Sequence, residues 1–505
     1  MRSFLEDAAH YPGGHAAGVV RPRSIEEVSA CLRNGDRILA VGAQSSLTGG
    51  ATPFGDVVLS TDLLTEIHVS GDRVRVGAGV ALQMLQDELA NSGRWFPPVP
   101  TYLGAFAGGA VATCAAGAAT FKYGTVREWV EALTIVLAGG DVLRLARGER
   151  KATSGAFEIQ TSTGVRTVRI PDIRMPNVPK HSAGYFLAPE MDLIDLFIGS
   201  EGTLGVIVDA TFRTAARPAA ICRALVPVPS EPAAIALTGD LRAASQETWR
   251  SRDPRGIDIA AIEHMDARSI AVIREDGIDR KLDVTLPSGA QVALLIDLEL
   301  PADDGTLWSQ LESIRDDSAG DTPLVRFCRL LDRHGVLDDT EIALPADRSR
   351  AAAFAELREA VPAGVNRRVA IAKQQDPAIS KTAADMIVPF DRFGEMMTEC
   401  RRLFAERDLD LAVWGHISDG NVHPNVIPQR AGDVEKGRDA ILELGAAVIE
   451  MGGCPLAEHG VGRNPIKQQL LRQLYGPAGI DAMRAIKLSL DPNGSLACGV
   501  IFPTQ

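Results

Sequence analysis

The chain has 505 residues, enough for two or three domains with developed cores. Hydrophobic residues make up 46% and charged residues 23%, a balance that is typical of globular proteins and excludes wholesale disorder. The net charge of −13 disfavours nucleic acid as a partner, because binding a phosphate backbone needs clustered Lys and Arg. The 7 cysteines include no C-x-x-C pair, so zinc ribbons, iron–sulfur ligand runs and disulfide frameworks all lack their spacing.

The N-terminus contains Glu6 and Asp7 before any apolar stretch, so it does not resemble a secretory signal. The longest uncharged stretch, 95–121, is built largely from Ala and Gly after its prolines and would insert weakly into a bilayer. We therefore expect a cytoplasmic protein without a membrane span.

The first part of the chain alternates short apolar runs with turns. Runs bounded by Gly or Asp predict strands at 37–42, 56–60, 73–77 and 134–138. Helical spacing is present at 24–32, where Ser24 is a good N-cap, and again at 81–90. The polar stretch 146–168 predicts a hairpin on the surface. This half is therefore expected to be α+β or α/β.

Longer helical segments follow a change of composition near residue 216, which predicts a domain boundary there. Helices are predicted at 347–360 and 432–450, and they alternate with strands at 292–300 and 409–415. No repeat of 20–50 residues is visible, which disfavours a solenoid or a propeller.

Four glycine-rich segments stand out in the first half. Residues 41–50 follow a predicted strand, and their backbone N–H groups and hydroxyls could form a nest for a pyrophosphate. The loop is not a P-loop, because Leu47 replaces the second Gly, and 77–82 is not a Rossmann fingerprint, because Leu82 replaces the third. A single loop of this kind is more often a structural turn, and that alternative stays open here.

The other three segments are 98–117, 122–130 and 197–207. The first is rich in small residues, which let backbone approach a large planar ligand. The last is not a hydrolase nucleophile elbow, because Ile198 stands where that motif needs Gly.

In their order and spacing these segments resemble the FAD-binding domain of the vanillyl-alcohol oxidase / p-cresol methylhydroxylase (PCMH) superfamily. The branch is that of D-lactate dehydrogenases, D-2-hydroxyglutarate dehydrogenases and glycolate oxidase flavoprotein subunits. The resemblance runs from about residue 20 to 503, and Gly-Ser-Glu-Gly-Thr-Leu-Gly at 199–205 is its most specific part in this half.

The resemblance implies that the glycine-rich segments bind FAD. No His, Cys or Tyr lies in 41–50, so we expect the FAD to be non-covalent. The residues expected at the cofactor are Val41, Gly42, Ala43, Gln44, Ser45, Ser46, Thr48, Gly49, Pro100, Thr101, Gly104, Gly108, Gly109, Ala112, Thr113, Gly117, Tyr123, Glu201, Gly202, Gly205, Val206 and Ile207.

The second half carries two histidines on a predicted hairpin. If residues 418–421 form the turn, His416 lies opposite His423. Directly opposed Cβ atoms are about 4.5–5.5 Å apart, close enough for two imidazoles to share one ion. A hydrogen-bonded or half-exposed His pair is the alternative.

Glu458 and His459 lie in a second glycine-rich run. Glu458 would complete a two-His, one-carboxylate set with open coordination positions, as a catalytic ion requires, and would leave His459 as a base. Both residues can serve one site only if the backbone turns there, which Gly460 and Gly462 permit. An exposed Glu–His pair on a loop is the alternative.

The same branch carries matching Gly-His-x-x-Asp-Gly-Asn-x-His and Ala-Glu-His-Gly-x-Gly-Arg motifs. The resemblance therefore implies that a divalent ion, zinc or manganese, is bound by three residues, namely His416, His423 and Glu458. It also implies that His459 abstracts the hydroxyl proton of the substrate.

The resemblance further implies that Arg358 binds the substrate carboxylate, which a planar guanidinium can contact with two hydrogen bonds. An exposed helix Arg paired with a nearby Glu is the alternative. Lys381 is a candidate for a second polar contact with the substrate. One departure is that Ala497-Cys498 replaces the Asn-Pro found near the end of many relatives, which leaves dehydrogenase versus oxidase behaviour open.

We therefore predict an α+β flavoprotein with a PCMH-type FAD-binding domain over 1–215. A substrate or cap domain, of the FAD-linked oxidase C-terminal type with a ferredoxin-like antiparallel sheet and helices, should cover 216–450. The segment 451–505 should return to the FAD domain. The expected reaction oxidises a D-2-hydroxy acid (lactate-, glycolate- or 2-hydroxyglutarate-like) to the 2-oxo acid, with hydride transfer to flavin N5.

The chain has no Cys cluster or haem motif, so electrons should pass to a separate quinone, cytochrome or electron-transfer flavoprotein. Such an acceptor could bring the protein to a membrane surface, and a homodimer is left open. Other functions also stay open: a flavoprotein for a different alcohol, an oxidase, a metal-dependent hydrolase, and a non-catalytic flavoprotein subunit. The motifs do not specify which acid is the substrate.

Overall fold

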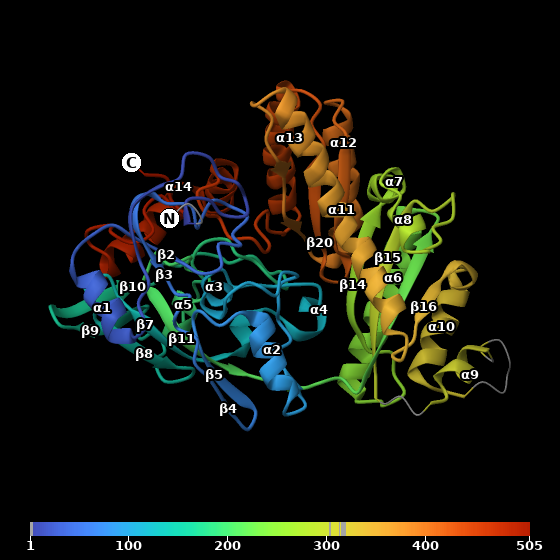
Figure 1. The fold of residues 1–505 in the computed structure, drawn as a ribbon, viewed down its shortest axis with the longest axis horizontal. Helices are drawn as coiled ribbons and strands as arrows, with labels where there is room; N and C mark the ends of the chain where they lie inside the picture. Colours follow the sequence, from blue (N-terminus) through green and yellow to red (C-terminus); the bar gives the residue numbers. More distant parts are fainter. Residues whose placement is uncertain (1–3, 302–304, 313, 315–319, 505) are drawn as a thin grey trace. The chain divides into compact units, whose positions relative to one another are not determined.

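The computed structural model describes residues 4–301, 305–312, 314 and 320–504. The chain forms two compact units (Figure 1). Unit 1 consists of Met1–Gly117, Gly124–Arg217 and Cys454–Gln505, and unit 2 of Ala118–Tyr123 and Pro218–Gly453. The C-terminal segment therefore belongs to the same unit as most of the N-terminal half.

Unit 1 contains a parallel three-stranded sheet and an antiparallel five-stranded sheet. The first has the order β1 (His15–Val20), β3 (Phe54–Ser60), β2 (Ile38–Val41). The second has the order β4 (Ile67–Ser70), β5 (Arg73–Gly77), β11 (Val206–Arg213), β7 (Val130–Val136), β8 (Val142–Ala146). The four strands predicted in this half correspond to β2, β3, β5 and β7.

Two further strand pairs belong to unit 1, namely β6 (Arg94–Trp95) with β12 (Ala215–Ala216), and β9 (Ala156–Thr161) with β10 (Gly164–Arg169). The second pair is the predicted hairpin. Its Phe157, Ile159 and Val168 are buried, so one face of the hairpin packs against the protein.

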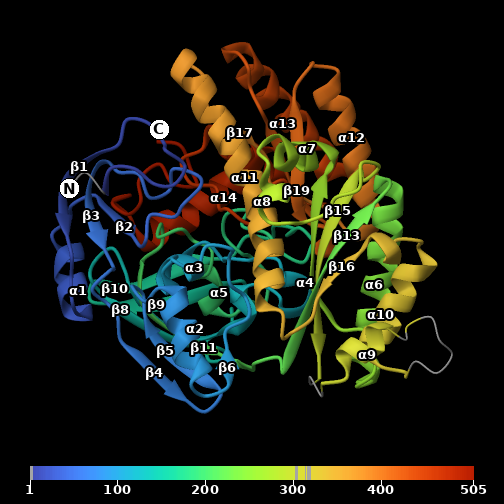
Figure 2. The same ribbon diagram turned by 45° about the vertical axis from the view of Figure 1, so that its right-hand side comes forward.

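The helices of unit 1 are α1 (Ile25–Arg33), α2 (Leu82–Ala90), α3 (Ala107–Ala112), the 3₁₀ helix η2 (Val126–Trp129), α5 (Leu193–Phe197) and α14 (Pro465–Leu490). Ser24 caps α1 as predicted, because its Oγ accepts a hydrogen bond from the Glu27 N–H at 3.3 Å. The small α3 lies against β5 and β11 (Figure 2). This packing positions the glycine-rich residues 104–113 beside the five-stranded sheet.

The C-terminal segment extends the pairing at β2. The Ile38 N–H donates to the Ser495 carbonyl, and the Ala497 N–H donates to the Ile38 carbonyl, both at 2.8 Å. Residues 495–497 thereby run parallel to the start of β2. These backbone bonds explain why the end of the chain belongs to unit 1.

Unit 2 is built on an eight-stranded sheet in which all pairs are antiparallel. Its order is β16 (Glu341–Ala343), β13 (Ala220–Val228), β15 (Val292–Leu300), β14 (Ile259–Asp266), β19 (Leu411–His416), β20 (Asn421–Val426), β17 (Thr382–Ala383), with β18 (Met386–Ile387) also paired to β20. The strands predicted at 292–300 and 409–415 correspond to β15 and β19.

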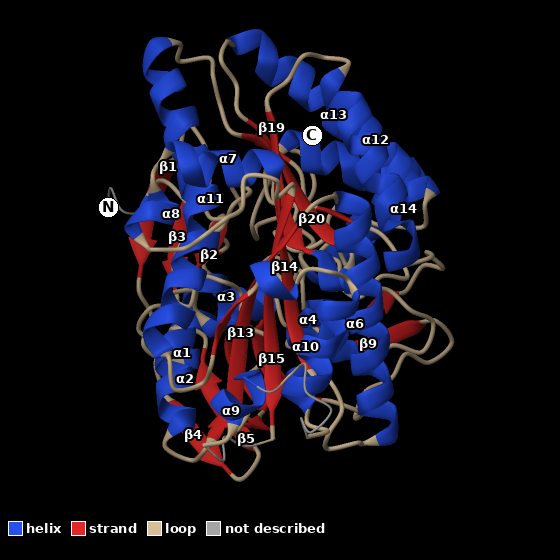
Figure 3. Ribbon diagram, turned by 90° about the vertical axis from the view of Figure 1, so that its right-hand side faces the viewer, coloured by secondary structure: helices blue, strands red, loops and turns tan. Residues whose placement is uncertain are grey.

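The helices of unit 2 are α4 (Thr120–Tyr123), α6 (Glu231–Ser251), α7 (Ala267–Glu275), α8 (Ile278–Lys281), α9 (Leu307–Glu312), α10 (Pro323–Arg333), η3 (Leu337–Asp339), α11 (Arg348–Gln375), η4 (Phe390–Arg392), α12 (Phe393–Ala405), η5 (Ile417–Asp419) and α13 (Ala431–Glu450). Figure 3 shows helices on both faces of the sheet. Met265 and Leu295 face the core formed with α7 and α11. The neighbouring His264 contacts Glu231 of α6 and Phe393 of α12, since successive strand residues point to opposite faces.

Helix α11 is longer than the segment predicted at 347–360, because it continues through Pro362 to Gln375. A proline inside a helix removes one backbone hydrogen bond and normally favours a helix end. Here Leu357, Val361 and Val365 are buried in the core of unit 2 on both sides of the proline. Tertiary packing therefore overrides the local signal for termination.

Within the described residues, no helix combines the length and the apolarity needed to cross a membrane.

Candidate functional site

The glycine-rich segments of unit 1 lie next to one another. A Cβ added at Gly42 would lie 3.4 Å from the Cβ of Phe106, which precedes α3. The Glu201 N–H donates to the carbonyl of Ala112, the last residue of α3, at 2.8 Å. The loop 41–50, the region around α3 and the start of 199–207 therefore form one surface of backbone and small side chains.

Two glycines on this surface face open space. A Cβ at Gly109 or Gly202 would meet no heavy atom within 4 Å, whereas a Cβ at Gly108 would lie 2.6 Å from that of Ala78. Bare backbone beside open space is what allows close approach of a large ligand. The residues present therefore fit the FAD expected there.

The loop 41–50 is also organised by its own side chains. Ser46 Oγ accepts hydrogen bonds from the N–H groups of Thr48 at 3.3 Å and Gly50 at 3.2 Å. Gly49 has a φ of 75° and packs against Tyr11, so a side chain would be strained and would clash there. Ser46 and Gly49 thus shape the loop, as the structural-turn alternative suggested, whether or not they also contact a ligand.

Tyr123 lies in a different environment from the other residues expected at the cofactor. It belongs to the short stretch 118–123 of unit 2, and its hydroxyl donates to Glu299 at 2.7 Å. Lys122 bonds both Glu299 at 2.6 Å and Asp258 at 2.7 Å. Burial and the neighbouring Glu299 charge raise the pKa of Tyr123. These bonds fasten 118–123 to β15 and to the residue before β14.

The remaining expected cofactor residues occupy varied positions in unit 1. Val206 and Ile207 are buried in β11, and a Cβ at Gly117 would clash with the Val99 carbonyl at 2.2 Å. Thr101 is exposed, and Thr113 Oγ1 donates to the Gly109 carbonyl at 3.0 Å.

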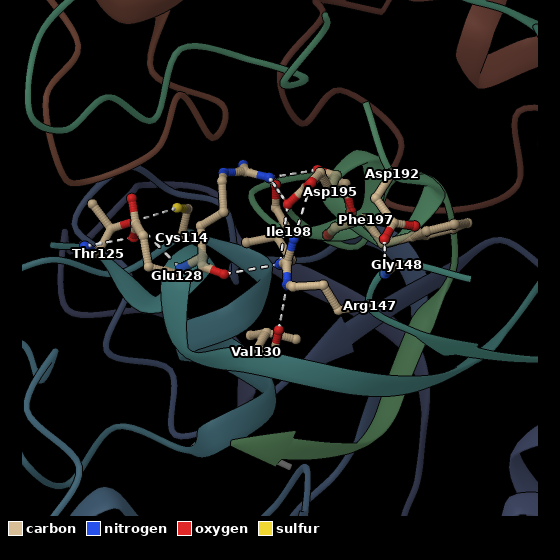
Figure 4. Close-up of polar contacts among 12 residues, drawn as sticks. Cys114, Thr125, Glu128, Val130, Arg147, Gly148, Asp192, Asp195, Phe197 and Ile198 are labelled. Atoms are coloured by element: carbon tan, nitrogen blue, oxygen red, sulfur yellow. Dashed lines mark hydrogen bonds and ion pairs between the residues drawn. The ribbon is translucent and has the colours of Figure 1, made fainter. Parts of the chain in front are cut away.

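The chain leading to Gly199 is held by a charged network (Figure 4). Asp195 in α5 accepts from Arg127 at 3.1 Å and from Arg147 at 3.1 Å. Arg127 also donates to the Ile198 carbonyl at 2.7 Å, one residue before Gly199. Arg147 donates to the Val130 carbonyl at 2.7 Å and so ties the network to β7. The backbone that carries Glu201 therefore starts from a rigid base.

The Glu458–His459 turn belongs to unit 1 and is held at several points. Buried Lys180 forms an ion pair with Glu458. The Gly460 N–H donates to Ser182 Oγ at 2.9 Å. His459 Nε2 lies 3.9 Å from a Glu458 carboxylate oxygen. Glu458 is buried and His459 is partly exposed, so the alternative of an exposed Glu–His pair does not describe this loop.

Gly460 and Gly462 provide the backbone turn that the sequence required. Their φ angles of 72° and 56° are left-handed. The carboxylate of Glu201 lies in the turn and accepts from the N–H groups of Val461 at 2.7 Å and Gly462 at 2.9 Å. Burial raises the pKa of Glu201 to about 7, because the hydrogen bonds from these neutral N–H groups offset only part of the lost hydration.

The predicted register of the histidine hairpin is wrong. His423 in β20 is paired with Trp414, and His416 is paired across the sheet with Glu263 of β14. The connection is not a four-residue turn, because it contains the 3₁₀ helix η5 and then Gly420 with a φ of 86°. The two imidazoles still lie close, with ring centroids 5.5 Å apart and ring planes at 87°.

Glu263 links the histidine pair to Arg358. Its carboxylate lies 2.6 Å from His416 Nδ1 and accepts from Arg358 Nε at 2.8 Å. Burial alone would raise the pKa of Glu263, but the charges of Arg358 and His416 and their hydrogen bonds lower it to about 2. Because an ionised carboxylate can only accept, His416 Nδ1 must be the donor.

His423 has a carboxylate neighbour of its own. Its Nδ1 lies 3.3 Å from Asp385, which also accepts from Asn421 Nδ2 at 3.1 Å. Each histidine therefore turns Nδ1 toward a buried carboxylate, so Nε2 is the nitrogen that would coordinate an ion. Carboxylates in this role fix the tautomer and raise ligand basicity. The His416–His423 pair therefore fits a divalent ion.

Arg358 and Lys381 differ in environment. Arg358 is buried in α11 and also donates to Glu359 at 2.9 Å, so the alternative of an exposed helix arginine is wrong about burial but right about a glutamate partner. Lys381 is exposed and lies just before β17.

Sequence reasoning missed Glu263, Asp385 and Lys180. The signal for Glu263 was a charged residue directly after the apolar run 259–262, since an unpaired charge in a buried strand is costly. Asp385 and Lys180 lie in irregular segments whose sequence offers no comparable signal.

Two families match the chain. Residues 229–501 match the FAD linked oxidases, C-terminal domain, and residues 16–146 match the FAD binding domain family. The chain is 27% identical to the D-lactate dehydrogenase of Archaeoglobus fulgidus, with 96% of this chain and 90% of that protein covered. It is also 27% identical to glycolate oxidase subunit GlcD of Bacillus subtilis, covering 96% and 88%.

A third relative, the mitochondrial D-2-hydroxyglutarate dehydrogenase of Bos taurus, is 27% identical, covering 97% of this chain and 78% of that protein. Among solved structures, an alkyldihydroxyacetonephosphate synthase has a TM-score of 0.56 at 13% identity, covering 95% of this chain and 76% of that one. At this identity the structural likeness shows the fold alone. Together the matches confirm the resemblance and the expected α+β fold.

Proposed function

Because the chain belongs to the FAD-linked oxidases, we propose that it oxidises a D-2-hydroxy acid to the corresponding 2-oxo acid. The relatives named D-lactate dehydrogenase, glycolate oxidase subunit and D-2-hydroxyglutarate dehydrogenase support this class, since each aligns with almost the whole chain. The proposed substrates are therefore lactate-, glycolate- or 2-hydroxyglutarate-like acids.

The observation that carries the proposal is the buried chain Arg358–Glu263–His416. It joins a guanidinium, which can bind a carboxylate, to a histidine that can hold an ion for the adjacent hydroxyl. A 2-hydroxy acid presents a carboxylate and a hydroxyl on neighbouring carbons. One glutamate thus organises groups for both substrate functions.

The proposed roles follow from the chemistry of each residue. When bound, FAD supplies the hydride acceptor, and zinc or manganese supplies a Lewis acid for the substrate hydroxyl. Arg358 binds the substrate carboxylate, and His416 and His423 hold the ion through Nε2. Glu458 remains the third predicted ligand, and Lys381 remains a predicted polar contact. His459 takes the hydroxyl proton as general base.

Electrons must then leave the protein. The sequence carries neither a Cys cluster nor a haem motif, so we propose a separate acceptor such as a quinone, a cytochrome or an electron-transfer flavoprotein.

The absorption spectrum of the purified protein tests the cofactor. We expect flavin bands, and acid precipitation should leave the yellow colour in the supernatant because 41–50 contains no residue for a covalent bond. Colour retained in the pellet would contradict the non-covalent assignment.

Anaerobic mixing with D- and L-2-hydroxy acids tests the substrate class. We expect D-acids to bleach the flavin bands and L-acids to leave them unchanged over the same time. A flavin-loaded protein that no 2-hydroxy acid reduces, while another alcohol does, would overturn the proposed class. Re-oxidation by oxygen then separates an oxidase from a dehydrogenase.

A further inference from the structure

Glu201 has a left-handed backbone conformation, and its carboxylate accepts hydrogen bonds from two backbone N–H groups. Its φ of 50° lies in the left-handed region, which costs energy for a residue with a side chain. Its two carboxylate oxygens accept separately, Oε1 from Val461 N–H at 2.7 Å and Oε2 from Gly462 N–H at 2.9 Å. Backbone strain of this kind persists only where surrounding contacts enforce it, so the position of the carboxylate is strongly specified.

The turn that receives this carboxylate fits closely around it. A Cβ at Gly460 would lie 2.9 Å from the Glu201 carboxylate, and a Cβ at Gly462 would lie 2.2 Å from Thr48 Oγ1. Any side chain at either glycine would therefore displace Glu201 or Thr48. The backbone of 460–462 is shaped to the carboxylate on one side and to the 41–50 loop on the other.

The residues on both sides of His459 are fixed by polar contacts. On its N-terminal side Glu458 pairs with Lys180, and on its C-terminal side Gly460 bonds Ser182 at 2.9 Å. The two bonds from Glu201 follow immediately at Val461 and Gly462. All these groups belong to unit 1.

Glu201 itself starts from a rigid base. Its own N–H donates to the Ala112 carbonyl at 2.8 Å, and the residues before Gly199 are held by the Asp195 network described above. The backbone of Glu201 is therefore fixed, and this allows its carboxylate to hold the turn that it binds in one position.

We propose that Glu201 is a positioning residue for His459: its bidentate contact with the N–H groups of Val461 and Gly462 fixes the turn that aims the imidazole. The inference rests on the proposed function, in which His459 is the base. It gives Glu201 a role through the backbone, in place of the direct cofactor contact expected from its motif.

The test compares Glu201→Gln with the control Glu190→Gln, which makes the same change at an exposed residue of unit 1. In Glu201→Gln the amide NH₂ faces a backbone N–H, so one hydrogen bond is replaced by a donor–donor contact. Stopped-flow flavin reduction at pH 8 should give a limiting rate about 10- to 100-fold lower per bound FAD, with substrate affinity unchanged. Glu190→Gln should behave as the parent.

Hydrogen exchange provides a readout that does not depend on turnover. Amides of 459–463 should exchange about tenfold faster in Glu201→Gln, with FAD content unchanged. Glu201→Asp keeps the charge but shortens the side chain, so it should lose at least one of the two bonds to the turn, show the same changes and serve if Glu201→Gln does not fold.

Three outcomes would overturn the inference: a parent-like limiting rate, weaker substrate binding as the only change, or loss of FAD with unchanged exchange at 459–463. The last would return Glu201 to cofactor binding. If no 2-hydroxy acid reduces the flavin of the parent protein, the proposed function fails. The exchange rates of 459–463 in Glu201→Gln still decide whether Glu201 fixes the turn: faster exchange supports that role and unchanged exchange contradicts it.

Discussion

Two glutamates, one in each unit, hold predicted functional residues by different physical means. Glu263 in unit 2 lies between Arg358 and His416, and its pKa is lowered to about 2. Glu201 in unit 1 accepts from two backbone N–H groups, and burial raises its pKa to about 7. The hydrogen-bonded charges of Arg358 and His416 outweigh the cost of burying the Glu263 carboxylate. At Glu201 the two backbone N–H groups and the charge of Lys467 do not outweigh it.

The difference also concerns what each glutamate orients. Glu263 bonds side chains directly, so it sets the tautomer of His416 and the direction of Arg358. Glu201 bonds backbone, so it sets the shape of a turn next to His459. The following predictions run from the largest expected effect to the smallest and separate these two modes.

Removing the predicted ion should have the largest effect, and it tests the unit 2 region. Exhaustive chelation or His423→Ala should abolish flavin reduction by substrate while FAD stays bound, because the ion activates the substrate hydroxyl. The assay is anaerobic flavin bleaching combined with elemental analysis. Full turnover in a protein shown to be metal-free would refute the metal assignment.

Replacing the predicted base tests the unit 1 region. His459→Asn should lower the limiting rate of flavin reduction by about 10²- to 10⁴-fold with little change in substrate affinity, because a general base acts as charge develops. Stopped-flow measurements across substrate concentrations yield both constants. A variant that reduces its flavin at the parent rate would remove His459 from the mechanism.

Arg358→Lys should weaken substrate binding in the ground state. A lysine cannot reproduce the two parallel N–H donors, so the loss should be about 1.5–3 kcal/mol, or roughly 10- to 150-fold in affinity. The apparent dissociation constant from flavin reduction measures this. Unchanged affinity for every acid tested would assign Arg358 to packing around Glu263 alone.

The pH dependence of stability should reveal the raised pKa of Glu201. A carboxyl group with a raised pKa holds its proton in the folded state between its ordinary value near 4.5 and about 7. The contribution of this protonated carboxyl group to the free energy of unfolding is fully present below its ordinary pKa, and it is lost as pH rises through about 7. Urea unfolding with saturating FAD should therefore show a fall in stability from pH 5 to pH 8 that is smaller in Glu201→Gln. An identical slope in both proteins would contradict the raised pKa.

The smallest effect is expected at Ala497, which adopts a φ of 44° next to the backbone pairing with Ile38. Left-handed backbone is costly for alanine but not for glycine. Ala497→Gly should therefore stabilise the protein by about 0.5–1 kcal/mol. The comparison of urea midpoints checks this, with Ala116→Gly, at a buried alanine whose φ is not left-handed, as the control that should destabilise.

Much of the fold and several site residues could be predicted from local patterns. The strands β2, β3, β5 and β7, the Ser24 cap and the helix near residue 432 all follow from signals within a few residues. The requirement for a turn at Gly460 and Gly462 is equally local, because adjacent strand residues cannot face the same side.

The rest depended on tertiary structure. The pairing of His416 with Glu263 joins residues 153 positions apart, and the pairing of Arg358 with the same carboxylate joins residues 95 apart. Local hairpin spacing suggested a different register, and the proline in α11 suggested an earlier end than core packing allows. The sequence by itself thus determined which residues carry the chemistry and where the backbone must bend. Only the tertiary structure decided the partners of each charge, because burial and pairing depend on strands that meet from distant parts of the chain.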